Sequence, residues 1–386
     1  KTEKERTVEI VKILGDTLPA TAAVQSTDKE VLKEIKRVNV SQDVLVNFSK
    51  AIENVGGQSE AEIILCLEGD TKEKHMKTVS DMLDADMKFI RLYQFMMLPG
   101  TQSTTTESRK KWEYMTRYRV LPRCFGEYSI LGKKFPVAEI EEICVANTTM
   151  PYEAYQECRK FDLTVEIFNN DSILADLMGF LRRYNIKRSD FIKEVHELSI
   201  NDPVFSKFYE EFNAEEKKNL SSEPKKLEKF TREPGVIKKY IDGEFGTNEL
   251  YKFRALAVFF NIKDLHKIAY KAAKFLLQKG NTLEENMNNY LDELYEFSVL
   301  RKSDCLNTSS VREKIFHYDF KKLLDNHFSI DPLETYMPQG IDTKLTHTKD
   351  QVSLIKTYED QYGTDLIGLG RILLRANMAR LYLSVE

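Results

Sequence analysis

Apolar residues in the first half of the chain follow two different spacings. Short, nearly continuous apolar runs predict buried strands, and the amphipathic segments between them predict helices. We expect strands at residues 20–24, 62–67, 89–98, 139–146 and 163–168, helices at 3–15, 28–38, 42–55, 72–85, 107–118 and 151–161, and a loop at 121–132. Helices that alternate with apolar strands are typical of a parallel sheet, so the expected fold class is α/β.

From about residue 172 onward the pattern changes to long helical periods. Helices are expected at 174–184, 189–198, 204–215, 248–259, 265–277, 282–299 and 311–325, with a terminal helix from about residue 366. A polar stretch at 219–235 is expected to be a connector. We therefore place a domain boundary near residues 169–172, with an α/β part at 1–168 and a mainly α-helical part at 169–386.

Polar residues come directly after the first predicted strand. Gln25 and Ser26 follow its last apolar residue, and one of Ser26, Thr27 and Asp28 is expected to cap the next helix. Arg37 lies near the end of that helix. Open α/β sheets and barrels have their binding sites at the carboxyl ends of strands. A strand-end amide and a surface arginine would have no function by themselves, but the order of the surrounding motifs favours a binding site.

Several motifs, taken in order, resemble the C-terminal half of a radical SAM barrel, and in particular its cobalamin-binding subgroup. The fourth barrel strand and its helix are similar to AVQSTDKEVLKEIKR, the fifth strand to AEIILCLEGDT and the sixth to RLYQFMMLPGT. Residues 117–171 resemble the segment that follows the barrel in this subgroup. The resemblance implies a partial TIM-type (β/α) radical SAM barrel with an α-helical C-terminal domain.

The resemblance also implies a site for S-adenosylmethionine (SAM). Gln25, Arg37 and Glu62 match a Gln, an Arg and an acid that hold SAM in related enzymes. A guanidinium can hold the SAM carboxylate through two charge-assisted hydrogen bonds, and backbone groups at two strand ends would frame the adenine. The expected cofactor-binding residues are Gln25, Ser26, Arg37, Glu62, Cys66, Leu67, Tyr93 and Gln94. No catalytic residue is assigned.

The fifth-strand motif departs from the family pattern at three positions. Cys66 replaces the usual Gly, Glu68 replaces Pro, and Asp70 replaces Glu or Gln. A cysteine side chain is larger than the hydrogen of glycine, so Cys66 is expected to crowd the adenine.

The cluster-binding motif of the family is not in this sequence. Radical SAM enzymes hold three irons of a [4Fe–4S] cluster with Cys-x3-Cys-x2-Cys. The five cysteines are Cys66, Cys124, Cys144, Cys158 and Cys305, and no two of them lie within ten residues of each other. We therefore expect the cluster ligands, and any cobalamin domain, to lie outside this chain. The chain begins with Lys, and the simplest interpretation is a fragment that starts after the third barrel strand.

The resemblance implies a full-length enzyme that cleaves SAM reductively at the [4Fe–4S] cluster. The expected outcome is cobalamin-dependent methyl transfer to an unactivated carbon. Its expected partners are a small-molecule or peptide substrate and an electron donor such as flavodoxin or ferredoxin. Two alternatives stay open. One is a cluster-less half barrel that acts as a binding or scaffolding module, and the other is a cobalamin-free radical SAM enzyme such as a methylthiotransferase or porphyrin-type oxidase.

Charge and composition restrict the remaining classes of function. A formal charge of −4, from 57 basic and 61 acidic residues, creates no field that favours nucleic acid or an anionic membrane. No apolar run has the length of a spanning helix and no signal peptide is visible. The dispersed cysteines do not form a secreted disulfide framework. His196 lacks a second His four residues away, so no zinc-protease pattern and no metal site are expected. The expected location is the cytoplasm.

Overall fold

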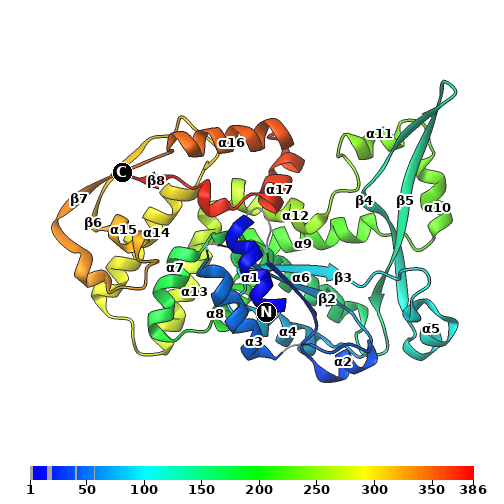
Figure 1. Cartoon of the computed structure of the whole chain (residues 1–386), viewed down its shortest axis with the longest axis horizontal. Helices are drawn as coiled ribbons and strands as arrows, with labels where there is room; N and C mark the ends of the chain where they lie inside the picture. Colours follow the sequence, from blue (N-terminus) through cyan, green and yellow to red (C-terminus); the bar gives the residue numbers. More distant parts are fainter. Residues whose placement is uncertain (1–2, 15–19, 40, 56) are drawn as a thin grey trace. The chain divides into compact units, whose positions relative to one another are not determined.

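The computed structural model describes residues 3–14, 20–39, 41–55 and 57–386 (Figure 1). Two compact units are distinguished by their internal packing. The first contains Lys1–Leu163 and Lys207–Lys252, and the second contains Thr164–Ser206 and Phe253–Glu386. The expected domain boundary at 169–172 stays a prediction, because compact units need not coincide with domains.

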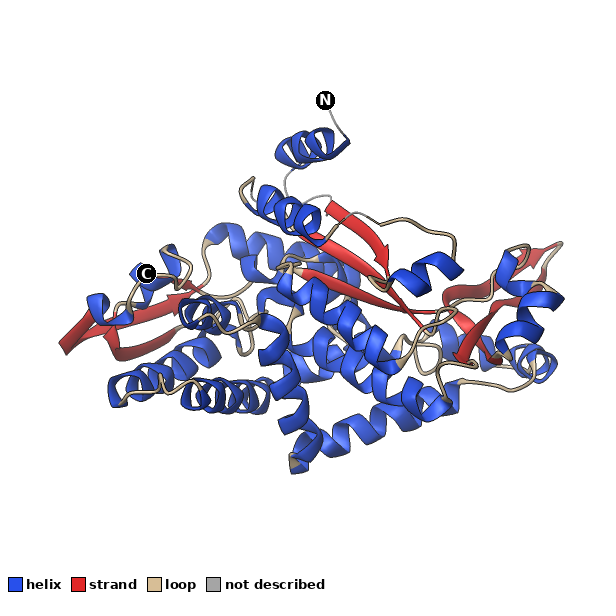
Figure 2. Cartoon of the chain, turned by 90° about the horizontal axis from the view of Figure 1, so that it is seen from below, coloured by secondary structure: helices blue, strands red, loops and turns tan. Residues whose placement is uncertain are grey.

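A three-stranded parallel sheet forms the centre of the first unit. Its strands are β1 (Ala20–Gln25), β2 (Ser59–Leu65) and β3 (Phe89–Gln94), in the order β1-β2-β3. The expectation of a parallel sheet is confirmed, and the α/β fold class with it. The remaining strands form two antiparallel sheets (Figure 2).

Helices connect the parallel strands. α2 (Lys29–Glu34) and α3 (Gln42–Glu53) lie between β1 and β2, and α4 (Lys72–Asp84) lies between β2 and β3. α1 (Glu3–Leu14) precedes β1, and α5 (Thr106–Trp112) follows β3. Asp28 is the residue that caps α2, because its carboxylate accepts hydrogen bonds of 3.0 Å from the backbone N–H groups of Glu30 and Val31. The helix expected at 28–38 is shorter than predicted. It ends at Glu34, since Lys36 has a φ of 54° and turns the chain.

The two faces of the sheet have different surroundings. On β2 the side chains of Ala61, Ile63 and Leu65 are fully buried, and α3 and α4 pack against this strand. Glu62 and Ile64 alternate with them and are only half-buried. Successive side chains of a strand point to opposite faces. The sheet therefore has one apolar, helix-covered face and one polar face.

A long antiparallel hairpin follows the parallel sheet (Figure 1). Its strands are β4 (Met115–Ile130) and β5 (Lys133–Ala146). Two predictions are wrong here, since the helix expected at 107–118 ends at Trp112 and the loop expected at 121–132 belongs mostly to β4. Pro122 lies at a register shift between Val120 and Phe125, where the strand accommodates it as an irregularity.

The tip of the hairpin is a two-residue turn. Leu131 has a φ of 50° and Gly132 a φ of 76°, and two positive φ values are typical of the tight turns that match strand twist. The helices α10 (Pro224–Thr231) and α11 (Val236–Ile241) pack against both strands around Val120 and Phe125. The connector expected at 219–235 therefore contains a helix.

The second unit is mainly helical. Its helices include α7 (Ala175–Leu181), α8 (Arg188–Asn201), α13 (Ile262–Lys279), α14 (Glu285–Lys302), α15 (Phe320–Asp325), α16 (Lys349–Tyr362) and α17 (Leu366–Arg375). The helices α6 (Tyr152–Phe168), α9 (Pro203–Asn219) and α12 (Glu249–Ala255) each contain a boundary of the two units. Residues 163–168 were expected to form a strand, but they continue α6, because no turn residue interrupts the helix before Asn169.

An antiparallel sheet completes the second unit. Its strands are β6 (Arg312–Tyr318), β7 (Tyr336–Thr346) and β8 (Ser384–Val385), in the order β6-β7-β8. The helix expected at 311–325 is wrong over its first half. Ile315 and His317 are exposed there while Phe316 and Tyr318 are buried, and this period of two residues is that of a strand.

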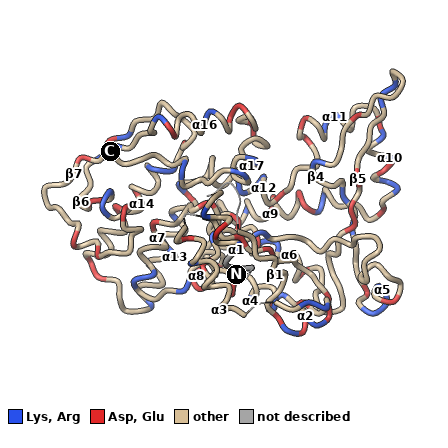
Figure 3. Tube along the Cα trace, in the orientation of Figure 1, with Lys and Arg blue, Asp and Glu red and all other residues tan. Residues whose placement is uncertain are grey.

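Charged side chains of both signs are interspersed along the chain (Figure 3). Within the described ranges, no helix combines the length and the apolar character needed to cross a membrane.

Candidate functional site

The structure brings Gln25 and Arg37 into contact at the carboxyl end of β1. Arg37 Nη1 donates a hydrogen bond of 2.8 Å to Gln25 Oε1, and its Nη2 donates to the carbonyl oxygen of Ala23. Asn39 Nδ2 donates to the carbonyl oxygens of Val24 and Ser26, both at 2.6 Å. The spacing of twelve residues thus closes a polar loop around the end of the strand. That the pair binds SAM stays a prediction.

Arg37 keeps part of its hydrogen-bonding capacity. A guanidinium has five N–H donors in a planar fork. Nε donates to Asn39 Oδ1 at 3.4 Å, and Nη1 and Nη2 use one N–H each for Gln25 and Ala23. One N–H on each terminal nitrogen is left by this count, and two parallel N–H groups are the donor set that a carboxylate accepts. The contacts within the chain fix the position of the guanidinium.

Ser26 lies beside this loop, and its side chain makes hydrogen bonds within the chain. Its side chain is buried, and its Oγ lies 3.4 Å from Thr78 Oγ1 on α4. The backbone N–H of Asp28 also donates to Ser26 Oγ at 3.2 Å. These contacts connect the end of β1 to the start of α2 and to α4.

Glu62 supplies a carboxylate on the polar face of the sheet. Its register partner on β3 is Arg91, but Arg91 Nε pairs instead with Glu60 Oε1, at 2.6 Å. Glu62 forms no hydrogen bond or ion pair with any residue that the structure describes. Since it is half-buried, this carboxylate can accept hydrogen bonds from an ammonium group or from hydroxyl groups.

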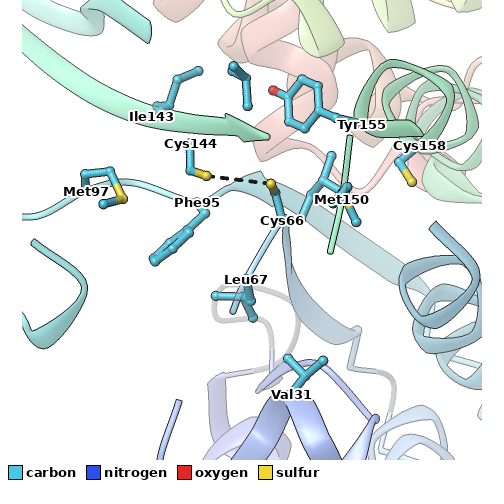
Figure 4. Packing of buried hydrophobic residues seen from close by; sticks show 12 residues of the cluster. Val31, Cys66, Leu67, Phe95, Met97, Ile143, Cys144, Met150, Tyr155 and Cys158 are labelled. Carbon is cyan, nitrogen blue, oxygen red and sulfur yellow. Dashed lines mark hydrogen bonds between the residues drawn. The ribbon is translucent and has the colours of Figure 1, made fainter. Parts of the chain in front are cut away.

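Cys66 occupies a backbone position that favours glycine. Its φ is 72°, in the left-handed region where a side chain costs free energy. This explains why a Gly is usual at the matching position of the family motif. Gln25, at the end of the neighbouring strand, also has a positive φ, of 62°. Such strained positions cluster at functional sites. The Cys66 side chain is fully buried and lies beside Cys144, so it points into the core (Figure 4).

Backbone groups at the end of β2 already have partners in the chain. Asn147 Nδ2 donates to the carbonyl oxygens of Cys66 and Leu67, at 3.1 and 3.2 Å. The N–H of Cys66 donates to Asp70 Oδ2 at 3.3 Å. Glu68 is buried and accepts hydrogen bonds from Ser103 and Tyr114. The strand end that was expected to frame the adenine is therefore held rigidly.

The end of β3 presents one exposed and one buried side chain. Tyr93 is 42% exposed, and partial burial raises its pKa to about 12. The side chain of Gln94 is buried. Its Nε2 donates to Tyr155 Oη at 2.6 Å and to Glu216 Oε1 at 3.0 Å, and its Oε1 accepts from Arg119 at 2.6 Å. Only the backbone of Gln94 is then left for a ligand.

Gln94 belongs to a buried polar network that the sequence analysis missed. Arg159 Nε pairs with Glu216 at 2.7 Å, Arg119 with Glu141 at 2.6 Å, and His75 with Asp162 at 2.8 Å. These residues come from α4, α6, α9, β4 and β5. No local pattern marks them, because each looks like an ordinary surface charge in its own segment.

Burial and charge act against each other at His75 in this network. Burial opposes the protonated imidazole, but the carboxylates of Asp162 and Asp70 raise the pKa of His75 above its ordinary value. At Asp70 burial dominates and raises the pKa to about 6.

The thiols of this chain do not fit a [4Fe–4S] cluster. The cluster needs three converging cysteine sulfurs when SAM binds the fourth iron. Among the residues that the structure describes, no group of three or more His, Cys, Asp or Glu side chains has the geometry to hold a metal ion. Cys66, Cys144 and Cys158 share one core, but Cys124 is exposed and lies outside it.

Comparison with known proteins gives one partial similarity. No protein-family model matches the chain. Over 192 residues the chain is 28% identical to the cobalamin-dependent radical SAM methyltransferase TokK of Streptomyces tokunonensis. The aligned part is 47% of this chain and 27% of that protein, so the chain spans about a quarter of its relative. At this coarse level the comparison supports a radical SAM-like, enzymatic function, in line with the resemblance of the strand motifs.

Proposed function

We propose that this chain supplies the SAM-binding strand ends of a cobalamin-dependent radical SAM methyltransferase. The observation that carries the proposal is the 192-residue similarity to an enzyme of that description. The contact between Gln25 and Arg37 at the end of β1 supports it, because the family motif requires these two side chains to share a ligand. The parallel sheet supports it as well, since its strand ends are the usual place for such a site.

The side chains at this end of the sheet suit the charges of SAM. The carboxylate of its methionine part would accept from Arg37, with the free amide hydrogens of Gln25 beside it. The ammonium group would donate to Glu62, the half-buried carboxylate on the polar face. Bound SAM would supply the methyl group and the radical that this chemistry requires. The chain's own residues bind and orient it.

The iron–sulfur cluster and cobalamin would come from outside these 386 residues. The cysteines of this chain do not fit the cluster. The proposed partners are a small-molecule or peptide substrate and an electron donor such as flavodoxin or ferredoxin. The helices of the second unit would then serve to recognise the substrate.

Glu62→Gln tests the proposed site with little effect on folding. The variant removes the charge and keeps the shape of the side chain, and Glu62 makes no ion pair within the described residues. A hydrogen bond to a charged group contributes about 1.5–3 kcal/mol, so the Kd for SAM should rise by a factor of about 10 to 150. The measurement is isothermal titration of SAM into the chain, with the thermal midpoint recorded for both proteins.

The matched control is Glu107→Gln, an exposed carboxylate on α5. It should leave the affinity for SAM unchanged. Equal SAM affinities for the wild type and Glu62→Gln would rule out the assigned role of Glu62. If the wild type shows no SAM binding with a Kd below about 10 mM, the proposal itself is wrong.

A further inference from the structure

Two buried cysteines meet between the end of β2 and strand β5. The sulfur atoms of Cys66 and Cys144 are 3.7 Å apart, although the residues are separated by 78 positions in the sequence (Figure 4). Both side chains are fully buried, and Cys158 lies in the same core cluster. The proposed SAM site makes no use of either thiol group.

Hydrogen bonds arrange the two thiols in a directed chain. Cys144 Sγ donates to the carbonyl oxygen of Ala146 at 3.2 Å, which leaves its sulfur lone pairs for the Cys66 thiol. On the other side, Asn147 Nδ2 lies 3.6 Å from Cys66 Sγ, but the carbonyl oxygens of Cys66 and Leu67 accept its two hydrogens.

We propose that Cys66 and Cys144 are a dithiol that hydrogen peroxide oxidises to a disulfide between the end of β2 and β5. This inference is independent of the proposed function. In the first step the thiolate of one of the two cysteines attacks peroxide, the O–O bond breaks and a sulfenic acid forms with loss of hydroxide. In the second step the other cysteine attacks that sulfur, the S–S bond forms and the S–O bond breaks with loss of water. In total, two thiols and one peroxide give one disulfide and two water molecules.

The disulfide would change the strand end that lies beside the proposed SAM site. A disulfide needs its sulfurs at about 2.05 Å, so the two side chains must move from the 3.7 Å of the reduced arrangement. Cys66 is held by its N–H bond to Asp70 and by its carbonyl bond to Asn147. Oxidation moves the Cys66 sulfur next to these contacts, and it removes the thiol donor from Ala146.

The surroundings of Cys66 determine how fast the reaction proceeds. The hydrogen bond with Cys144 and the burial of the side chain raise the pKa of the Cys66 thiol well above its ordinary value. Because the thiolate is the form that reacts, oxidation should be slow at neutral pH and faster in alkaline solution. Cys124 is exposed and is the thiol that should react with peroxide independently of this pair.

Peptide mapping of the oxidised chain tests the proposal. The whole chain is treated with hydrogen peroxide at pH 7 and at pH 8.5, denatured, alkylated and digested without reduction. We expect a cross-linked peptide that joins Cys66 to Cys144, formed faster at pH 8.5. In Cys124→Ser, the number of free thiols should fall from four to two. The thermal midpoint of this oxidised variant should rise, because a cross-link restricts the unfolded chain.

Two variants distinguish this pair from its neighbour. Cys158→Ala should still form the cross-link, and Cys144→Ala should lose it. Because Cys144→Ala also leaves a cavity that can destabilise the fold, the test depends on the peptide map of the wild-type chain. Oxidation confined to Cys124, a cross-link between Cys66 and Cys158, or full retention of the Cys66 and Cys144 thiols would each overturn the proposal.

Discussion

Replacing Arg254 with methionine should destabilise the second unit by about 3–5 kcal/mol. The guanidinium is fully buried. Its Nε donates to Asp171 Oδ2 at 2.6 Å, its Nη1 to Glu166 Oε2 at 3.1 Å, and its Nη2 to the carbonyl oxygen of Leu373 at 2.9 Å. Methionine fills a similar volume but leaves two buried carboxylates without this cation. The free energy of unfolding, obtained from urea denaturation, measures the loss.

A surface pair provides the control for this prediction. Lys321 and Asp325 form an exposed ion pair one helical turn apart on α15, so Lys321→Met should cost about 0.5 kcal/mol or less. If uncompensated charge causes the loss in Arg254→Met, the additional substitution Glu166→Gln should recover part of it. Equal effects of Arg254→Met and Lys321→Met would show that the buried ion pairs do not stabilise the unit.

Asp70→Asn should change the pH dependence of stability by about 3 kcal/mol. Burial raises the pKa of Asp70 from 3.8 to about 6. Between these two values the folded chain binds a proton that the unfolded chain does not. The stability contributed by this proton is complete below pH 3.8 and is lost as the pH rises through about 6. Each unit of pKa shift is worth about 1.36 kcal/mol, so a rise from 3.8 to about 6 corresponds to about 3 kcal/mol.

Asparagine cannot ionise, so the variant lacks this decline, and its carbonyl oxygen can still accept the N–H of Cys66. The measured quantity is the difference in unfolding free energy between wild type and Asp70→Asn at about pH 4 and pH 7. As the pH rises, the unfolding free energy of Asp70→Asn should increase relative to that of the wild type. The Asp70 carboxylate also helps to raise the pKa of His75, so the variant loses part of that shift, and this adds to the difference in the same direction. Asp43→Asn, at an exposed position on α3, is the control. A difference that does not change with pH would contradict the burial argument.

Local sequence patterns predicted the structure correctly where the residues of one segment determine that segment's structure. The apolar runs predicted the parallel strands, and the polar residues after the first run predicted the capped helix at Asp28. The resemblance named Gln25 and Arg37 together, and the structure brings them into contact, because a short helix returns the chain to the end of β1. The strand ends could therefore be predicted from the sequence, and the role of the site residues near them stays a prediction.

Features that depend on distant partners were not predictable in this way. The β4–β5 hairpin contains Pro122 and Gly126, which usually mark loops, and only its pairing over many residues identifies it as strands. Residues 163–168 satisfy a strand pattern, but the preceding helix continues through them. The sequence also could not show that Cys66 lies beside Cys144, or that Gln94 is engaged by Arg119 and Glu216, because these partners come from other elements.

Hydrogen exchange with and without SAM tests the central claim most directly. The claim is that the carboxyl ends of β1, β2 and β3 form the SAM site. With millimolar SAM, peptides that cover residues 20–27, 62–70 and 91–96 should exchange more slowly, while β7 in the second unit should be unaffected. Protection confined to other peptides, or none at a concentration at which titration shows binding, would contradict the account.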